Sequence, residues 1–319
     1  MNSIMERKSI VIFLMGPTAC GKSNLAIKLR NYLPVDIISV DSGLVYRDLN
    51  IGTAKPTKQE LIQAPHKLVD IKNAEDNYSA GEFKKEVLIA ISEIINNKKI
   101  PLLVGGTMLY YKILLEGLTE LPSADIKLRK HFIKEAKIIG LSCFHKKLKI
   151  IDPVSANRIH PNDLQRVVRA LEVYFISGKT LSELTNKKNY FFPYQAIQFS
   201  LIPRNILFLH KKIENRFRDM LDLGFQKEVE HLFNRKNLNV NSCSINRIGY
   251  FQMWKFLSGN ISYKDMIEQS ITATRQLAKH QMTWLKKWRN VHYIYNDSTD
   301  LSIKKILEIF KYYNSNTIF

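Results

Sequence analysis

The sequence has 319 residues, of which 45% are hydrophobic, and a net charge of +19 from 48 lysines and arginines against 29 aspartates and glutamates. The hydrophobic content excludes a disordered chain, and no apolar run approaches the roughly 20 residues of a membrane-spanning helix. The positive charge favours a polyanionic partner such as nucleic acid, although a general richness in lysine would also produce it. Three scattered cysteines fit a reducing cytoplasm, and the short segment 1–8 has no signal-peptide pattern.

A phosphate-binding motif, G-x-x-x-x-G-K-[ST], lies near the start of the chain. The apolar run 9–15 predicts a buried strand before it, and 24–30 predicts a helix after it. Glycines let the backbone approach a phosphate, N–H groups at a helix start point at the anion, and the lysine adds a positive charge. We therefore predict a di- or triphosphate site rather than an incidental turn, formed by Gly16, Pro17, Thr18, Ala19, Cys20, Gly21, Lys22 and Ser23, with the Ser23 hydroxyl as a ligand for Mg²⁺.

Further strands and helices alternate after this loop. Residues 35–40 and 101–104 predict buried strands, 67–71 a short strand, and 79–95 a helix. This alternation predicts an α/β fold with a parallel sheet covered by helices. Ligands in such sheets bind beyond the carboxyl ends of the strands, so Asp41, directly after the second strand, is expected to face the phosphate loop.

A helical insertion is predicted between two parts of the core. Residues 122–199, which include helix patterns over 125–137 and 163–175, form the insertion, and 1–121 and 200–319 form the catalytic core. In the second core segment, 199–203 and 206–209 have strand-like patterns, and long helices are predicted over 211–234 and 263–288.

Two of these helices carry basic residues along one side. Arg166 and Arg169 are three residues apart, and the last long helix carries Arg275, Lys279 and Lys286. Such a stripe is either a track for a phosphate backbone or an ordinary solvated face. The buried side of the last helix is predicted to contain Leu277, Gln281, Trp284, Leu285 and Trp288.

At this point the motifs resemble those of bacterial tRNA dimethylallyltransferases, a P-loop NTPase-like family. The matching stretches span nearly the whole chain: GPTACGKS, ISVDSGLVYRDLNIGTAKP, PHKLVDI, YSAGEF, LLVGGTMLYYKILLEGL, IHPNDLQRVVRALEVYFISGKT, IGYFQMW and TRQLAKHQMTWLKKW. The resemblance implies transfer of the dimethylallyl group from dimethylallyl diphosphate to N6 of the adenosine 3′-adjacent to the anticodon, with release of diphosphate. It also implies Mg²⁺ as cofactor and the tRNA anticodon stem-loop as partner.

The resemblance implies roles for individual residues. Adenine N6 is a weak nucleophile that needs a base, and the resemblance gives this role to Asp41, with Thr107 and Thr18 beside the reacting centre. Arg216 is expected near the phosphates, and His66 matches a family position that is either functional or structural. The expected tRNA contacts are Asp41, Ser42, Gly43, Leu44, Thr107, Arg129, Gln165, Arg166, Val167, Val168, Arg169, Arg247, Gly249, Tyr250, Lys279, His280, Gln281, Met282, Thr283, Trp284, Leu285 and Lys286.

The chain departs from the family pattern at a few positions. Cys20 replaces the more usual serine, and a cysteine beside helix-start N–H groups and Lys22 is expected to be reactive. Asn246 and Arg247 replace a basic and a small residue, and His280 replaces lysine or arginine, which weakens the basic stripe. A monomer is expected. The alternatives are a P-loop nucleotide kinase that uses ATP and a non-catalytic RNA-binding ATPase.

Overall fold

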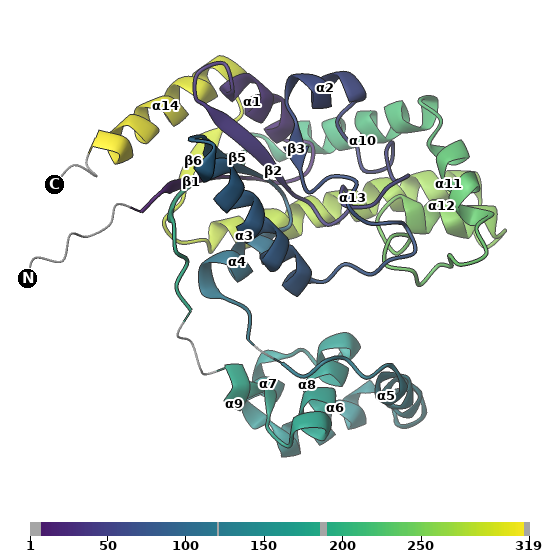
Figure 1. The fold of residues 1–319 in the computed structure, drawn as a ribbon. Helices are drawn as coiled ribbons and strands as arrows, with labels where there is room; N and C mark the ends of the chain where they lie inside the picture. The colour runs from purple at the N-terminus through teal and green to yellow at the C-terminus, as the bar shows by residue number, and fades with distance from the viewer. Residues whose placement is uncertain (1–7, 120, 186–189, 316–319) are drawn as a thin grey trace, which may run out of the picture. The chain divides into compact units, whose positions relative to one another are not determined.

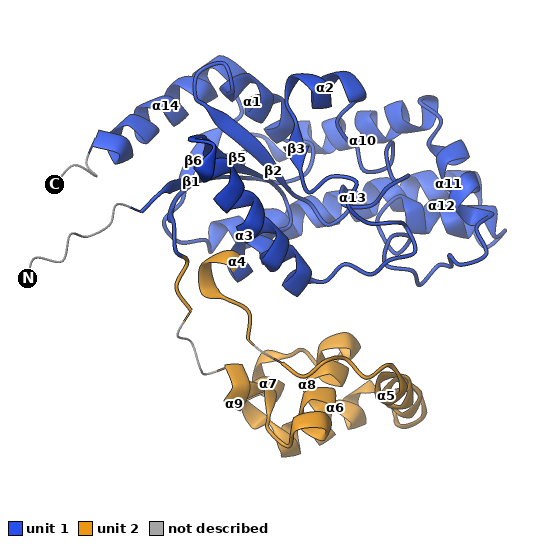
Figure 2. Ribbon diagram, viewed as in Figure 1, with its two compact units in different colours: residues 1–113, 193–319 blue, residues 114–192 orange. Residues whose placement is uncertain are grey.

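The computed structural model describes residues 8–119, 121–185 and 190–315. The chain divides into two compact units, which are shown in different colours in Figure 2. The core unit comprises residues 1–113 and 193–319, and the helical unit comprises residues 114–192. No helix in the described ranges is both long and apolar enough to cross a membrane.

The core unit is built on a six-stranded sheet with the strand order β3-β2-β4-β1-β5-β6, in which every pair is parallel (Figure 1). The strands predicted over 9–15, 35–40 and 101–104 are confirmed. Their side chains are almost entirely buried because helices cover both faces of the sheet. The strands are β1 (Ile10–Met15), β2 (Val35–Val40), β3 (His66–Lys67), β4 (Ile100–Gly105), β5 (Gln195–Ile202) and β6 (His292–Tyr295).

Alternate side chains of the central strands reach the two faces of the sheet. On one face, Ile12 and Leu102 pack against the helices α1 and α14, whose buried residues share one hydrophobic cluster with the strands. On the other face, Phe13 packs against Tyr111 of α4, with 5.1 Å between the ring centroids. Tyr111 is fully buried, and its hydroxyl donates to the backbone oxygen of Leu103 at 3.1 Å, which ties α4 to the sheet.

The helices mostly begin at a side-chain cap, which satisfies the free N–H groups of the first turn. In α3, Ser79 and Glu82 form a capping box, and the Asp125 carboxylate caps α5. The helices are α1 (Lys22–Leu29), α2 (Lys58–Gln63), α3 (Ala80–Asn96), α4 (Met108–Glu116), α5 (Ile126–Ile139), α6 (Leu141–Ile151), α7 (Pro153–Arg158), α8 (Leu164–Ser177), α9 (Leu181–Thr185), α10 (Ile206–Asp222), α11 (Phe225–Phe233), α12 (Tyr250–Leu257), α13 (Tyr263–Lys286) and α14 (Thr299–Ser315).

The structure corrects several predicted elements. The predicted strand at 206–209 is wrong, because Asn205 caps the start of α10 there. The predicted strand at 67–71 is limited to His66–Lys67, since Leu68 has a φ of 63°, which an extended strand does not tolerate. The single predicted helix 211–234 is two helices, separated at Gly224, where φ is +96°.

The helical unit consists of α5 to α9 around its own hydrophobic cluster. Phe132 and Phe144 lie at its centre and are at most 5% exposed. The boundary predicted at residue 199 falls too late in the chain, because β5 begins at Gln195 and residues 195–199 belong to the core sheet. Two of the predicted tRNA-contact residues, Val167 and Val168, are buried in this cluster, so their side chains support the helix and are not available for contact.

Candidate active site

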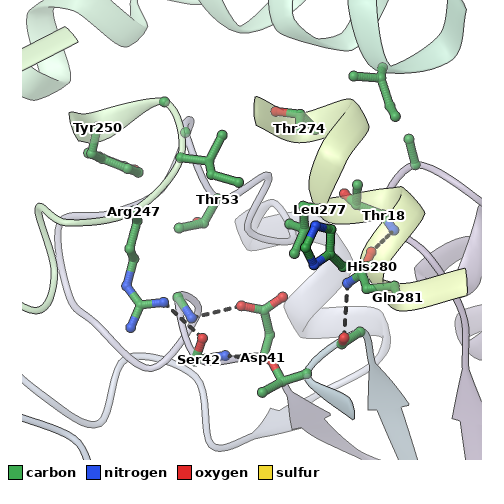
Figure 3. A pocket seen from close by; sticks show the side chains of 18 of the residues that line it. Thr18, Asp41, Ser42, Thr53, Arg247, Tyr250, Thr274, Leu277, His280 and Gln281 are labelled. Carbon is green, nitrogen blue, oxygen red and sulfur yellow. Dashed lines mark hydrogen bonds between the residues drawn. The ribbon is translucent and has the colours of Figure 1, made fainter. Parts of the chain in front are cut away.

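A pocket of ≈ 470 Å³ lies in the core unit, where the loops after β1, β2 and β4 meet α10, α13 and the segment before α12. Its walls combine backbone-rich loops with apolar side chains of the two helices, which is typical of a small-molecule or base-binding site. Figure 3 shows this pocket with Asp41 between the phosphate-loop residue Thr18 and a group formed by Thr53, Arg247 and Tyr250.

Asp41 and Thr107 come together because their strands are neighbours in the sheet. β2 and β4 are paired with Val40 opposite Gly105, so the first residues after both strands lie at one edge. The Thr107 hydroxyl accepts a hydrogen bond from the Ser42 backbone N–H at 3.2 Å. One Asp41 carboxylate oxygen accepts from the Gly43 N–H at 2.7 Å, which orients the side chain while leaving the other oxygen free of protein partners among the described residues.

The phosphate loop has the backbone form that the motif predicts. Gly21 caps α1 with φ of +90°, a value that favours glycine. Lys22 bends back over the loop, and its Nζ donates to the Pro17 backbone oxygen at 2.7 Å. Lys22 Nζ lies 3.7 Å from Cys20 Sγ, as the predicted reactivity of Cys20 requires, but the side chain is only 2% exposed and a reagent does not reach it in this conformation.

Gln281 connects the phosphate loop to the turn after β4. Its Oε1 accepts from the Thr18 backbone N–H at 2.9 Å, and its Nε2 donates to the Gly106 backbone oxygen at 2.9 Å (Figure 3). Both polar atoms of the amide are therefore engaged with protein groups. Gln281 was predicted as a tRNA contact, but in this structure it first fixes two loops that line the pocket.

Arg216 of α10 is a cation that lines the pocket. It is half-buried, and no ion pair or hydrogen bond links it to another described residue. Burial lowers its pKa and the nearby Asp41 carboxylate raises it, but the guanidinium remains charged at neutral pH. A charged group with free donors beside the phosphate loop suits a diphosphate, as predicted.

The residues fit Mg²⁺ held together with a diphosphate. The Ser23 hydroxyl is exposed at the start of α1 and makes no hydrogen bond with another described residue. No group of three metal-binding side chains exists within the described part of the chain. Because Mg²⁺ keeps several water molecules and binds through few protein ligands plus substrate phosphates, one hydroxyl beside the phosphate loop is sufficient.

On the far side of Asp41 from the phosphate loop, Arg247 forms part of the pocket wall. Its Nη1 donates to the Ser42 hydroxyl at 2.8 Å, and its guanidinium lies over the ring of Tyr46, 5.1 Å from the centroid. Its buried Nε has no partner among the described residues. Arg247 thus combines an ordered side chain with an unused donor, despite its departure from the family pattern. The predicted contacts Gly249 and Tyr250 line the same wall.

The predicted tRNA-contact residues along α13 differ in their exposure to solvent. Trp284 and Leu277 were predicted to be buried, but they are 37% and 40% exposed, because this side of the helix faces the pocket instead of the core. His280 also lines the pocket, whereas Leu285 is buried and not available for contact. The exposed or half-buried remainder of the predicted set on this helix is Lys279, Met282, Thr283 and Lys286.

In the helical unit, two predicted tRNA-contact arginines share one buried carboxylate. Arg129 donates from Nε and Nη2 to Glu172 at 2.9 and 3.0 Å, and Arg169 donates from Nη1 at 2.5 Å. Burial raises the pKa of Glu172, but hydrogen bonds from both guanidinium groups and from the Asp125 N–H outweigh it and lower the pKa overall. Arg166 differs: its side chain is 72% exposed, and Asp163 is its one ion-pair partner among the described residues.

His66 lies outside the pocket. It is in the edge strand β3, with its Nδ1 2.6 Å from the Ala64 backbone oxygen, and burial lowers its pKa. The structure thus supports the structural interpretation. Two threonines that line the pocket were missed: Thr53, in the GTAKP stretch, and Thr274, on the pocket side of α13. Thr53 could have been predicted because it belongs to a quoted motif, whereas no sequence feature pointed to Thr274.

Comparisons with known proteins match this chain over most of its length. A family model described as IPP transferase matches residues 44–288. The tRNA dimethylallyltransferase of Buchnera aphidicola subsp. Acyrthosiphon pisum (strain APS) is 54% identical over 305 residues, which cover 95% of this chain and 96% of that protein.

Solved structures show the same fold. The full-length tRNA isopentenylpyrophosphate transferase from Bacillus halodurans has a TM-score of 0.72 at 30% identity and covers 97% of this chain and 98% of its own. A eukaryotic dimethylallyltransferase captured acting on tRNA has a TM-score of 0.76 at 29% identity, and the match covers 90% of this chain and 74% of that one.

Proposed function

The chain belongs to the IPP transferase family and transfers a prenyl group to tRNA, and from this premise we propose how its pocket carries out the reaction. The donor is dimethylallyl diphosphate, and the acceptor is N6 of the adenosine 3′-adjacent to the anticodon. The observation that carries the proposal is the position of Asp41 in one pocket with the phosphate loop.

Asp41 acts as the general base. As the bond between N6 and C1 of the dimethylallyl group forms, the carboxylate accepts a proton from the N6 amine, and the C1–O bond breaks with its electrons leaving on diphosphate. The adenine lone pair is delocalised into the ring, so removal of this proton is needed for an efficient attack. The Gly43 N–H holds one carboxylate oxygen, and the free oxygen serves the substrate.

The phosphate loop stabilises the leaving diphosphate. Lys22 and Arg216 supply positive charge, and loop N–H groups at the start of α1 supply oriented dipoles, all placed before the reaction begins. The Ser23 hydroxyl and the diphosphate would hold Mg²⁺, which would supply further neutralisation of the developing charge. Gln281 holds the backbones of Thr18 and Gly106 in fixed positions beside the reacting groups.

The tRNA binds through the basic and aromatic side chains around the pocket mouth. A base in a stacked anticodon loop has to be flipped out to reach the pocket, and flipped bases are held by edge contacts and aromatic stacking. Trp284, His280 and Arg247 supply these groups from two sides of the pocket. The net charge of +19 supports attraction of the phosphate backbone.

The test uses Asp41→Asn with the anticodon stem-loop, dimethylallyl diphosphate and Mg²⁺. The asparagine Oδ1 still accepts from Gly43, so folding and diphosphate affinity are expected to remain, while turnover falls by roughly 10²–10⁴-fold, as for loss of a general base. Mass analysis of adenosine measures the product. Full activity of the variant removes Asp41 from the mechanism, and ATP hydrolysis without prenyl transfer by the unmodified protein would favour the kinase or ATPase alternatives.

A further inference from the structure

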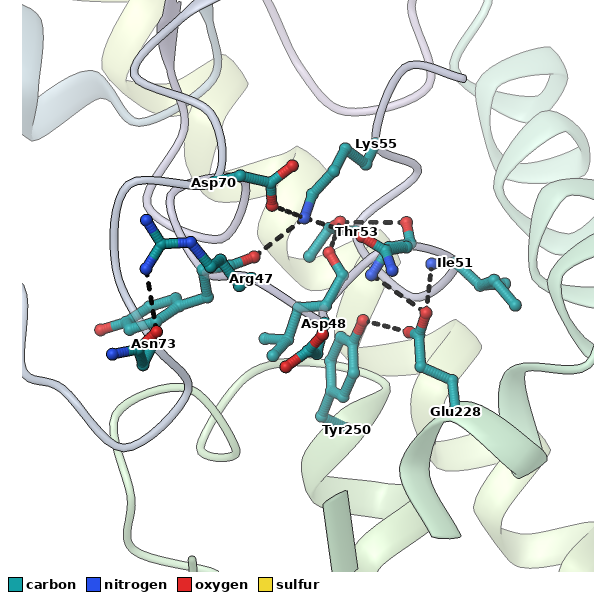
Figure 4. A network of polar contacts seen from close by, with 12 residues as sticks. Arg47, Asp48, Ile51, Thr53, Lys55, Asp70, Asn73, Glu228 and Tyr250 are labelled. Atoms are coloured by element: carbon teal, nitrogen blue, oxygen red, sulfur yellow. Dashed lines mark hydrogen bonds and ion pairs between the residues drawn. The ribbon is translucent and has the colours of Figure 1, made fainter. Parts of the chain in front are cut away.

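Glu228 of α11 binds a turn that is almost two hundred residues away in sequence. Its carboxylate accepts hydrogen bonds from three successive backbone N–H groups, those of residues 50–52, at 3.0, 2.8 and 3.2 Å (Figure 4). It also accepts from the Tyr250 hydroxyl at 2.6 Å. Successive N–H groups that converge in this way form an anion-binding concavity, and here the anion is a side chain of the same protein.

The turn that Glu228 holds is part of the pocket wall. Gly52 and the following residue, Thr53, both line the pocket, and the segment has no regular secondary structure of its own to fix it. A Cβ added at Gly52 would clash with Phe225 Cε2 and would lie 2.6 Å from Tyr250 Cε2, so the turn is packed directly on both rings. The Glu228 carboxylate and these two rings therefore hold this part of the pocket wall in place.

This wall adjoins the proposed base. A Cβ added at Gly43 would lie 3.2 Å from Asp41 Oδ1 and 3.2 Å from Thr53 Cγ2. Gly43 therefore lies directly between the side chains of Asp41 and Thr53. The phosphate loop, by contrast, meets the pocket at Thr18 and is tied to Gln281. The turn thus borders the part of the pocket that receives the nucleophile.

We propose that Glu228 is a positioning residue for the acceptor adenosine: it fixes the Gly52–Thr53 wall against which the flipped base is placed before Asp41. The inference rests on the proposed function, because it assigns this wall to the tRNA side of the reaction. Glu228 is not among the residues that line the pocket, so it acts through the groups that it holds, the turn and Tyr250.

A second tether makes the effect of Glu228 measurable without unfolding. Lys55 donates from Nζ to the Tyr46 backbone oxygen at 2.9 Å and to Asn50 Oδ1 at 2.8 Å, and it pairs with Asp70. These contacts hold the far end of the same segment independently of α11. Loss of the Glu228 carboxylate is therefore expected to shift the turn while the segment stays attached to the core unit.

The experiment compares Glu228→Gln with Glu230→Gln. The first change replaces one acceptor oxygen by an NH₂ group that faces backbone donors. Glu230 lies on the same helix but contacts Gln226, at 2.8 Å, and not the turn, so it is the matched control. We measure dissociation constants for the anticodon stem-loop and for dimethylallyl diphosphate with Mg²⁺, together with the kinetic constants for both substrates.

For Glu228→Gln, kcat/KM for tRNA is expected to fall by about 10–100-fold, the scale of a small misplacement of a reacting group, while dimethylallyl diphosphate affinity stays within about twofold. Tyr250→Phe keeps the three N–H contacts but removes one donor to the same carboxylate, so it is expected to lower kcat/KM for tRNA by less than Glu228→Gln does. Glu230→Gln is expected to behave as the unmodified protein.

Equal losses for both substrates, whether from a global defect or from misfolding, would overturn the assignment, as would an unchanged tRNA constant. A loss in Tyr250→Phe as large as in Glu228→Gln would assign the effect to the tyrosine instead. The proposed function has its own readout: an unmodified protein that forms no prenylated adenosine refutes that function, whereas the binding constants still show whether Glu228 acts on the tRNA side alone.

Discussion

Replacing Gln281 by methionine tests whether this residue serves the phosphate loop or the tRNA. Methionine has a similar length and no amide, so it removes the bond from the Thr18 N–H and the bond to the Gly106 oxygen, both 2.9 Å long. Each neutral hydrogen bond is worth about 1 kcal/mol, so the two bonds together contribute about 2 kcal/mol to holding the loops in place. This free energy corresponds to about a 30-fold change in an equilibrium constant.

The assay is the affinity for dimethylallyl diphosphate with Mg²⁺ by calorimetry, and the affinity for the anticodon stem-loop by fluorescence titration. We expect Gln281→Met to weaken diphosphate binding by about 30-fold at most, because the variant loses only the free energy by which the two hydrogen bonds order the loops. The tRNA affinity is expected to change by less than about threefold, since the amide atoms are already bonded to protein.

Gln276→Met is the matched control, since Gln276 lies on the same helix and is exposed to solvent. It is expected to leave both affinities unchanged. The reasoning fails if Gln281→Met weakens tRNA binding while diphosphate binding remains normal, because the residue would then act as the tRNA contact that the family resemblance implies.

Four further substitutions each test a single residue. Lys22→Ala should weaken diphosphate affinity and slow turnover together, and unchanged affinity in calorimetry would contradict a role in phosphate binding. Arg166→Ala should weaken tRNA binding and reduce the slope of log affinity against log salt by about 0.7–0.9, whereas Arg169→Ala should also lower the midpoint of thermal unfolding because it deprives Glu172 of a donor. Because Cys20 is buried, Cys20→Ser should keep the activity of the unmodified protein and should be inactivated by a thiol reagent at the same rate. Mass spectrometry should find modification first at the exposed Cys143 and Cys243. Slower inactivation of the variant would show that the loop opens.

The parts of the site that local pattern determines were predicted from sequence. A strand that ends in a turn places its next residue at the sheet edge, so the position of Asp41 followed from the apolar run before it, whereas the role of Thr107 came from the family resemblance. The phosphate loop followed from its spacing of glycines, lysine and serine. In each case the relevant information lies within about ten residues of the site, and the parallel sheet supplies the rest.

The parts that depend on distant pairing could not be predicted. Nothing near Glu228 indicates that its carboxylate meets residues 50–52, and nothing near Glu172 indicates that it collects Arg129 and Arg169. Hydrophobic periodicity also misled the assignment of Trp284, because an apolar stripe that lines a pocket looks like one that lines a core. A single residue with positive φ, Leu68, ended a strand that side-chain pattern would have extended.

The strand order is consistent with one pocket that receives both substrates of the proposed reaction. The phosphate loop follows β1 and Asp41 follows β2, and these strands are not neighbours, because β4 lies between them. Parallel strands are about 4.8 Å apart, so the two loops start about 10 Å from each other. In the proposed mechanism, that gap has room for C1 of the dimethylallyl group, which carries the diphosphate, and for the adenine N6 between C1 and Asp41. Thr107 follows the intervening β4 and is therefore expected beside the point where the new bond forms. If the base followed β4 instead, directly beside β1, the gap would be about 5 Å, too short to place both C1 and N6 between diphosphate and base.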